Sequence, residues 1–302
     1  MVEFKKIEGV CPILATTFSE NGEIDFESLE NLIEFLIEKG VNGITLFGFA
    51  GEFYKLLDDE KERILKFAIN IVKGRVPVIA SIMQHSFESA VSVVRLYEKL
   101  GANGIMVAPP NIFPLAEKDY HDFYLEIDKQ LNIPIIIQDA PRETKITLSS
   151  NFFINIFKKS RNISLIKIES YPPGLKITDI KKLSKGKINI FSGSAGIYLI
   201  DGLERGVDGT MPGSSLVDIY VKVFNSFKRG DIEKAYEIFN KYIPLLNFMH
   251  QSVEMIIKVE KTILKNRKVI KTNYCRYPSF YLDKIYMKQI NKLYALIEDI
   301  LN

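Results

Sequence analysis

Short apolar runs alternate with longer amphipathic segments along the first three quarters of the chain. Apolar runs of this length predict buried strands, and they lie at residues 13–17, 43–47, 76–82, 104–108, 134–138, 164–168, 188–191 and 209–211. The segments between them place apolar residues at helical spacing. Residues 26–39, for example, put Leu29, Leu32 and Leu36 on one face behind Asp25, a residue type that caps helices. The pattern therefore predicts repeated β-α units.

Three of the predicted helices are joined to the next strand by the same kind of turn. The joints begin at Gly40, Gly101 and Gly206, and each continues with a small or β-branched residue, Asn or Asp, and a second Gly. Glycine can adopt the left-handed conformation that ends a helix. Eight such units over about 230 residues predict a closed (β/α)8 TIM barrel. A doubly wound open sheet is the alternative, because periodicity alone does not show closure.

The alternation stops beyond Gly230. Residues 231–249, 252–264 and 283–301 predict helices with no strand between them. We expect residues 1–229 to form the barrel and residues 230–302 to form a C-terminal helical extension packed on it.

Composition narrows the classes of function. Of the 302 residues 47% are hydrophobic, and the net charge of +3 comes from lysines scattered along helical faces, which gives no indication of a nucleic-acid partner. No apolar run reaches membrane-spanning length, and the N-terminus lacks the apolar stretch of a signal peptide. Cys11 and Cys275 are too few and too far apart to indicate a disulfide framework or a zinc site. We therefore expect a cytoplasmic protein.

Lys167 is a charged residue within a predicted core strand. A buried ammonium is costly, so such a strand carries a lysine for a specific reason. At the mouth of a barrel, burial favours the neutral amine, which can attack a ketone and form a Schiff base. Glu169 points to the same side, because strand side chains alternate. The pair predicts a catalytic lysine with a proton shuttle, or else a lysine that reaches solvent and pairs with Glu169.

Glycine-rich loops follow several predicted strands at the end where barrel active sites lie. They contain Gly48 and Gly51 after the second strand, Gly193 after the seventh and Gly213 after the eighth. Glycines let the backbone approach a small ligand, and free N–H groups can bind a carboxylate. Three such loops on the rim that carries Lys167 indicate a binding site for a small anionic ligand.

These motifs resemble the dihydrodipicolinate synthase / N-acetylneuraminate lyase family. The segment from Gly48 to Leu56 is similar to the family's Gly-Thr-Thr-Gly-Glu signature, and Lys167 falls at the position of its Schiff-base lysine. At Ser192 and Gly193 the resemblance implies backbone that positions the keto acid. It also implies a TIM barrel, a homotetramer built as a dimer of dimers, and no metal or organic cofactor.

The chain departs from the family pattern at the residues that relay protons. Phe49 and Ala50 replace the two threonines, Gln138 replaces the strand-5 tyrosine, and Asn111 aligns with the second relay tyrosine. Glu143 stands in place of the arginine that binds the second substrate's carboxylate. Gln138 can form hydrogen bonds but cannot ionise. These differences argue against a lysine-pathway synthase.

The remaining polar residues predict how the site works. The amides of Ala50 and Gly51 are expected to hold the substrate carboxylate, and Glu169 to transfer protons in place of the missing tyrosine. Asp139 is a weaker candidate base. Further substrate contacts are expected from Phe49, Gln138, Asp139, Gly193 and Met211, and Phe113 is expected to help make the pocket apolar.

The function predicted from these features is that of a class I aldolase. It would cleave a 2-keto-3-deoxy sugar acid to pyruvate and a small aldehyde, with Lys167 forming the imine and Glu169 taking the C4 hydroxyl proton. A dehydratase that uses the same imine is the first alternative. A synthase-like or non-catalytic keto-acid-binding relative is the second.

Overall fold

The computed structural model describes residues 7–301 and contains eight parallel strands in the order β1-β8-β7-β6-β5-β4-β3-β2. The strands are β1 (Gly9–Val10), β2 (Ile44–Leu46), β3 (Val78–Ile82), β4 (Gly104–Val107), β5 (Ile135–Asp139), β6 (Ile163–Ile168), β7 (Asn189–Ser192) and β8 (Gly209–Thr210). Backbone hydrogen bonds from Thr45 to Pro12 and from Leu14 to Thr45 join the chain after β1 to β2. The sheet is therefore closed, which confirms the TIM barrel and excludes the open doubly wound alternative.

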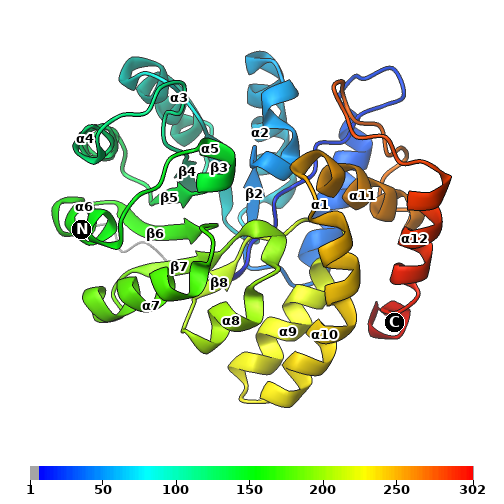
Figure 1. Cartoon of the computed structure of the whole chain (residues 1–302). Helices are drawn as coiled ribbons and strands as arrows, with labels where there is room; N and C mark the ends of the chain where they lie inside the picture. The colour runs from blue at the N-terminus through cyan, green and yellow to red at the C-terminus, as the bar shows by residue number, and fades with distance from the viewer. Residues whose placement is uncertain (1–6, 302) are drawn as a thin grey trace.

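Helices surround the strands, as Figure 1 shows. They are α1 (Phe26–Glu38), α2 (Asp58–Val72), α3 (Phe87–Lys99), α4 (Glu117–Asp128), α5 (Pro141–Thr144), α6 (Ser150–Lys159), α7 (Pro173–Ser184), α8 (Leu199–Glu204) and α9 (Val217–Lys228). Asp25 caps α1 as predicted, because its side chain accepts a hydrogen bond from the Ser28 N–H.

The prediction for the first strand was wrong. Gly9 and Val10 pair with β8, whereas the predicted run at residues 13–17 contributes only the isolated bridge between Ile13 and Thr45. Residues 13–15 are nevertheless buried. A buried apolar segment looks like a strand in sequence even where its backbone leaves the ladder, so the pattern could not separate the two cases.

The interior of the barrel is apolar below the level of Lys167. Leu165 on β6, Phe191 on β7 and Met211 after β8 belong to one buried cluster with Ile136 and Met106. Leu165 and Lys167 are two residues apart on β6, so both point inward, while Ile166 and Ile168 pack outward in the core beneath the helices. Lys167 thus lies directly above the apolar side chains that fill the barrel.

The C-terminal helices lie to one side of the barrel in Figure 1. They are α10 (Ile232–Met249), α11 (Val253–Asn266), α12 (Lys284–Tyr294) and α13 (Glu298–Leu301). The predicted helix at residues 283–301 is therefore two helices. α10 packs against α9, and α11 contacts the loop after β2. The division of the chain at residue 230 stays a prediction. Within residues 7–301, no helix combines the length and apolarity needed to span a membrane.

Candidate active site

A cavity opens at the carboxyl ends of the strands, where the sequence predicted the site. It contains about 530 Å³ of space free of protein atoms, part of it open to solvent. Five of the predicted residues line it: Phe49, Ala50, Lys167, Glu169 and Met211. The sequence therefore located the cavity and its central pair.

Lys167 and Glu169 form a buried ion pair at the bottom of this cavity. The Lys167 Nζ lies 3.0 Å from Glu169 Oε1, and the side chains are 4% and 10% exposed. Lys167 does not reach bulk solvent, so the alternative of a surface pair is excluded. A lysine amine held next to a carboxylate in a nearly dry pocket can pass its proton to that partner and become a nucleophile.

Glu169 is held by three groups in all. Its Oε1 also accepts a hydrogen bond of 2.8 Å from Gln138 Nε2, and its Oε2 accepts one of 2.9 Å from the Ser194 N–H. Burial alone would raise the pKa of Glu169, but the charge of Lys167 and these hydrogen bonds together lower it below its ordinary value. Glu169 is therefore an anion opposite Lys167.

Gly193 makes room for this carboxylate. A Cβ at position 193 would lie 2.3 Å from Glu169 Cγ, closer than non-bonded carbon atoms can approach. Gly193 does not line the cavity, and its N–H donates to the Ile168 carbonyl. Gly193 thus leaves space for the Glu169 side chain. This role differs from the direct substrate contact that we predicted for Gly193.

The loop after β2 is the predicted carboxylate site. It forms a single 3-10 turn, η1 (Phe49–Gly51), in which the Gly51 N–H donates to the Gly48 carbonyl at 2.9 Å. The Gly51 amide is therefore already used, and the prediction that it binds substrate was wrong. Among the hydrogen bonds of residues 7–301, none is donated by the N–H of Phe49 or Ala50. These two amides are free to bind an anion at the cavity wall.

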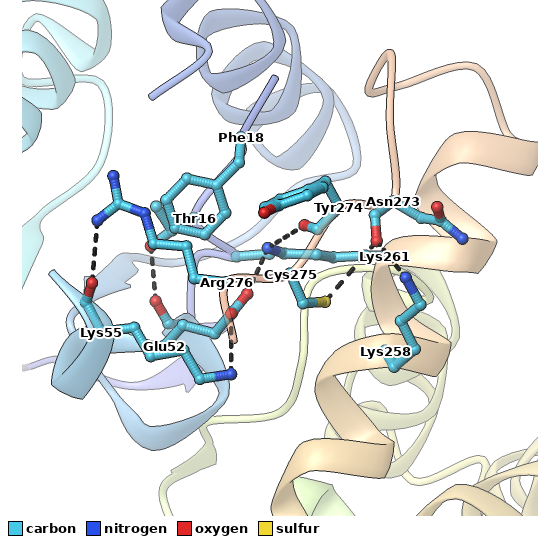
Figure 2. Close-up of polar contacts among 12 residues, drawn as sticks. Thr16, Phe18, Glu52, Lys55, Lys258, Lys261, Asn273, Tyr274, Cys275 and Arg276 are labelled. Carbon is cyan, nitrogen blue, oxygen red and sulfur yellow. Dashed lines mark hydrogen bonds and ion pairs between the residues drawn. The ribbon is translucent and has the colours of Figure 1, made fainter. Parts of the chain in front are cut away.

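Figure 2 shows the side chain of Glu52 with its basic partners Lys55 and Lys261. Glu52 follows η1 and precedes η2 (Phe53–Lys55), and its side chain is fully buried. Lys55 lies 3.2 Å from one carboxylate oxygen, and Lys261 of α11 forms an ion pair with the other. Lys261 also donates to the Tyr274 carbonyl at 2.9 Å. A C-terminal helix thus anchors the loop that carries the free amides.

Two predicted residues lie behind the cavity wall. Gln138 is buried and acts on Glu169 through its amide, as described above. Asp139 is buried and forms an ion pair of 2.6 Å with Lys176 of α7. Burial raises the pKa of Asp139 above its ordinary value, with the charge of Lys176 acting in the opposite direction. Neither residue lines the cavity, so neither is a direct substrate contact in this structure.

Sequence reasoning missed several residues that line the cavity. Tyr171 follows Glu169 by two residues, a spacing that could have indicated it. His250, Val253 and Ile256 come from the end of α10 and from α11, whose fold over the barrel mouth no local pattern predicts. Phe113, in contrast, is 75% exposed and does not line the cavity.

Glu143 also lines the cavity, at the position where the family resemblance places an arginine. It belongs to α5, the short helix that follows β5. The neighbouring Arg142 is exposed and donates a hydrogen bond of 3.3 Å to the Gln251 carbonyl. Arg142 therefore does not substitute for the missing arginine inside the cavity.

No group of three or more His, Cys, Asp or Glu side chains within residues 7–301 is arranged to hold a metal ion. The ionisable groups of the cavity are instead one lysine, two glutamates, one tyrosine and one histidine. Burial lowers the pKa of His250, so its ring is neutral at neutral pH. This set suits imine and proton-transfer chemistry.

Comparison with known proteins agrees with this geometry. A model of the dihydrodipicolinate synthetase family matches residues 6–297. The chain belongs to this family. Members of the family are pyruvate-dependent class I lyases, synthases and dehydratases that form a Schiff base through a lysine. The resemblance found in the sequence is thereby confirmed.

Individual relatives are distant but cover most of the chain. L-2-keto-3-deoxyarabonate dehydratase of Azospirillum brasilense is 27% identical over 274 residues, covering 89% of this chain and 88% of that protein. A probable 2-dehydro-3-deoxy-D-pentonate aldolase of Escherichia coli is 26% identical over 245 residues, covering 80% and 81%. The crystal structure of dihydrodipicolinate synthase from Rhodopseudomonas palustris matches with a TM-score of 0.90 at 27% identity, covering 96% of this chain and 97% of that one.

Proposed function

We propose that the protein is a Schiff-base-forming aldolase that cleaves a 2-keto-3-deoxy sugar acid to pyruvate and a small aldehyde. The observation that carries this proposal is the buried pair of Lys167 and Glu169, 3.0 Å apart, at the bottom of a cavity with free amides on its wall. The nucleophile, its proton acceptor and a carboxylate site are thus within one small pocket.

Imine formation follows from the contact between these two residues. Glu169 takes a proton from the Lys167 ammonium, and the neutral amine attacks C2 of the keto acid. The resulting carbinolamine loses its hydroxyl as water when Glu169 returns the proton, which leaves an iminium on Lys167. The Phe49 and Ala50 amides hold the substrate carboxylate during these steps.

The iminium then serves as the electron sink for bond cleavage. As the C4 hydroxyl loses its proton, C4 becomes an aldehyde and the C3–C4 electron pair forms an enamine, which neutralises the nitrogen. Protonation at C3 and hydrolysis of the iminium release pyruvate and regenerate Lys167. No metal or organic cofactor enters this sequence.

The side chains that line the cavity favour a substrate without a second carboxylate. Phe49 and Met211 contribute apolar surface to the cavity, and Glu143 would repel a second anionic group. Arg142 is turned to the Gln251 carbonyl, so it provides no replacement cation. These contacts favour a hydroxylated, uncharged distal end, and they argue against a synthase that condenses pyruvate with a charged semialdehyde.

A dehydratase is the second candidate, because Glu169 sits beside the imine nitrogen and is therefore close to C3. Removal of the C3 proton by Glu169 with loss of hydroxide from C4 would give a dehydrated keto acid without fragmentation. The Azospirillum brasilense relative is named for a dehydration of this type.

Product analysis separates the candidates. The protein is incubated with 2-keto-3-deoxyarabonate, 2-keto-3-deoxygluconate and their stereoisomers, and the products are identified by NMR. Pyruvate with an equimolar aldehyde supports the aldolase, whereas a dehydrated keto acid with the carbon chain intact replaces it by the dehydratase. If neither is formed, and pyruvate with glycolaldehyde gives no aldol product, the protein is a binding relative.

We also propose that the chain works in the cytoplasm as a homotetramer. Two apolar side chains after β4, Ile112 and Phe113, are 61% and 75% exposed in the single chain. Exposed neighbouring apolar residues of this size commonly mark contacts with another subunit.

A further inference from the structure

Glu143 is the second carboxylate of the cavity, and its surroundings differ from those of Glu169. It is half-buried, it lines the same cavity as Lys167, and it comes from α5 at the end of β5. Within residues 7–301, no other residue donates a hydrogen bond to its carboxylate and no ion pair includes it. Glu143 therefore lines the cavity with a carboxylate whose one protein donor is its own backbone N–H.

Glu169, by comparison, already has three partners. Lys167 and Gln138 share Oε1, and the Ser194 N–H occupies Oε2. Its position beside Nζ suits proton transfer at the imine nitrogen and at the adjacent C3. A proton on the oxygen at C4 is one carbon farther along the substrate, toward the distal wall. A second acid–base group near C4 would exchange the O4 proton in place of Glu169.

We propose that Glu143 is a catalytic residue that exchanges a proton with the C4 oxygen of the substrate, while Glu169 serves the nitrogen and C3. The inference rests on the proposed function and refines the sequence-based assignment, in which Glu169 alone took the C4 hydroxyl proton. It also assigns a role to the position at which the family resemblance places an arginine.

With these two roles, every proton transfer of the aldolase reaction has a donor and an acceptor. The Glu143 carboxylate takes the O4 proton as C4 becomes the aldehyde and the C3–C4 pair forms the enamine. A solvent proton carried by Glu169 then adds to C3, Glu143 releases its proton to solvent, and water hydrolyses the iminium. In a dehydration, protonated Glu143 gives its proton to the departing C4 oxygen, which leaves as water, while Glu169 takes the C3 proton.

The charges around Glu143 agree with this role. Burial and the nearby Glu169 raise the pKa of Glu143 above its ordinary value, while Arg142 and Lys167 act in the opposite direction. Tyr171 and His250 are the other ionisable groups that line the cavity, and the His250 ring is neutral at neutral pH. A carboxylate with a raised pKa exchanges protons more readily near neutral pH than an ordinary one does.

The test compares Glu143→Gln with the unmodified full-length protein and with Glu126→Gln. Glutamine keeps the shape of the side chain but cannot exchange a proton. Glu126 is an exposed glutamate on α4 paired with Lys129, outside the cavity. Three quantities are measured: the borohydride-trapped pyruvate adduct on Lys167, deuterium exchange of the pyruvate methyl group, and turnover of the 2-keto-3-deoxy acid.

We expect Glu143→Gln to keep the adduct and the methyl exchange, since neither involves a C4 oxygen. Turnover should fall about 100-fold or more, and the decline of kcat at acid pH that Glu143 causes should disappear. Glu126→Gln should match the unmodified protein in all three measurements.

Two results would overturn the inference and leave the proposed function intact. One is turnover by Glu143→Gln within about threefold of the unmodified protein. The other is a loss of adduct and methyl exchange in parallel with turnover, which would make Glu143 a structural residue. In contrast, absence of a Lys167 adduct in the unmodified protein would refute the proposed function itself.

Discussion

Lys167 Nζ and Glu169 Oε1 lie 3.0 Å apart although neither side chain is more than 10% exposed. The two residues are two positions apart at the carboxyl end of β6. Because side chains alternate along a strand, both point into the barrel mouth. Apolar residues fill the barrel below them, and the cavity opens above. The amine is therefore accessible to a ligand from one side, with its proton acceptor already in contact.

Replacing Glu169 by Gln should impair the chemistry at Lys167 itself. The variant loses the proton acceptor beside Nζ, so we expect the rate of adduct formation with pyruvate to fall about 100-fold. Reactions are quenched with borohydride at successive times, and the amount of adduct on Lys167 at each time gives this rate. An unchanged rate would remove Glu169 from imine formation, and it would leave Glu143 as the main acid–base candidate.

A methyl group at position 193 should disturb Glu169 without touching the substrate. In Gly193→Ala the new Cβ would meet Glu169 Cγ at 2.3 Å, so the carboxylate must move away from Lys167 and from the Ser194 N–H. We expect kcat to fall roughly tenfold to 100-fold, because misplaced catalytic groups lose rate steeply. Gly104→Ala is the control, since its Cβ would have its nearest neighbour at 3.5 Å. Equal activity of the two variants would show that Glu169 tolerates displacement.

Lys261→Met should weaken both the fold and carboxylate binding. The substitution leaves Glu52 buried with Lys55 as its remaining cationic partner, and breaking a buried pair in this way costs about 3 kcal/mol or more of unfolding free energy. Because Glu52 anchors the η1 loop, KM for the keto acid should rise more than kcat falls. Urea unfolding and steady-state kinetics measure the two effects.

The control for this prediction is Lys265→Met, which changes an exposed lysine of the same helix. The double variant Glu52→Gln/Lys261→Met should recover part of the lost stability, since it no longer buries an excess charge. An unfolding free energy of Lys261→Met equal to that of the control would show that the pair does not anchor the loop.

The pair of Glu60 and Arg276 should make stability depend on pH. Arg276 donates two hydrogen bonds, of 2.6 Å and 2.5 Å, to the Glu60 carboxylate and thereby holds the C-terminal segment on α2. These bonds lower the pKa of Glu60 below its ordinary value of 4.5. The stabilisation is thus present above pH 4.5 and is lost as pH falls through the lower folded value.

Comparing Glu60→Gln with the unmodified protein isolates this effect. At neutral pH the variant should be less stable by about 1.5–3 kcal/mol, the contribution typical of hydrogen bonds to a charged group. The difference should shrink as pH decreases below 4.5, because Glu60 becomes neutral first in the unfolded state and then, below its lowered pKa, in the folded state. A difference that does not change with pH would show that the ionised carboxylate is not responsible.

Phe113→Asp should disrupt the proposed homotetramer. The side chain is 75% exposed in the single chain, so the substitution is not expected to unfold the barrel. A charge in a subunit contact is unfavourable, and the mass measured by sedimentation should decrease to that of a dimer or monomer. If the unmodified protein is itself monomeric, or if the variant keeps the tetramer mass, Phe113 is not part of the interface.

The sequence predicted the barrel well because its evidence is local and repeated. Seven of the eight predicted strands overlap the observed ones, and the glycines at Gly40, Gly101 and Gly206 have the positive φ that the turns require. The first strand failed because burial of residues 13–15 comes from packing, whereas ladder pairing depends on a register set by β8.

The site was predictable where one strand determines it. Lys167 and Glu169 follow from alternation along β6, and Gln138 lies beside Lys167 because β5 and β6 pair in that register. His250 and Lys261 could not be assigned in this way, since their positions depend on C-terminal helices folding back over the β2 loop and the barrel mouth. The ion pair of Asp139 on β5 could not be predicted either, because its partner Lys176 lies on α7, more than 30 residues farther along the chain.

The central claim is that the Lys167 amine captures a ketone covalently. The most direct measurement is reduction of the full-length protein with sodium borohydride in the presence of pyruvate, followed by mass spectrometry of the peptide that contains Lys167. The account predicts one stable carboxyethyl adduct per chain, on Lys167, and none in Lys167→Met. An unmodified Lys167, or an adduct that forms equally on other lysines, would contradict it.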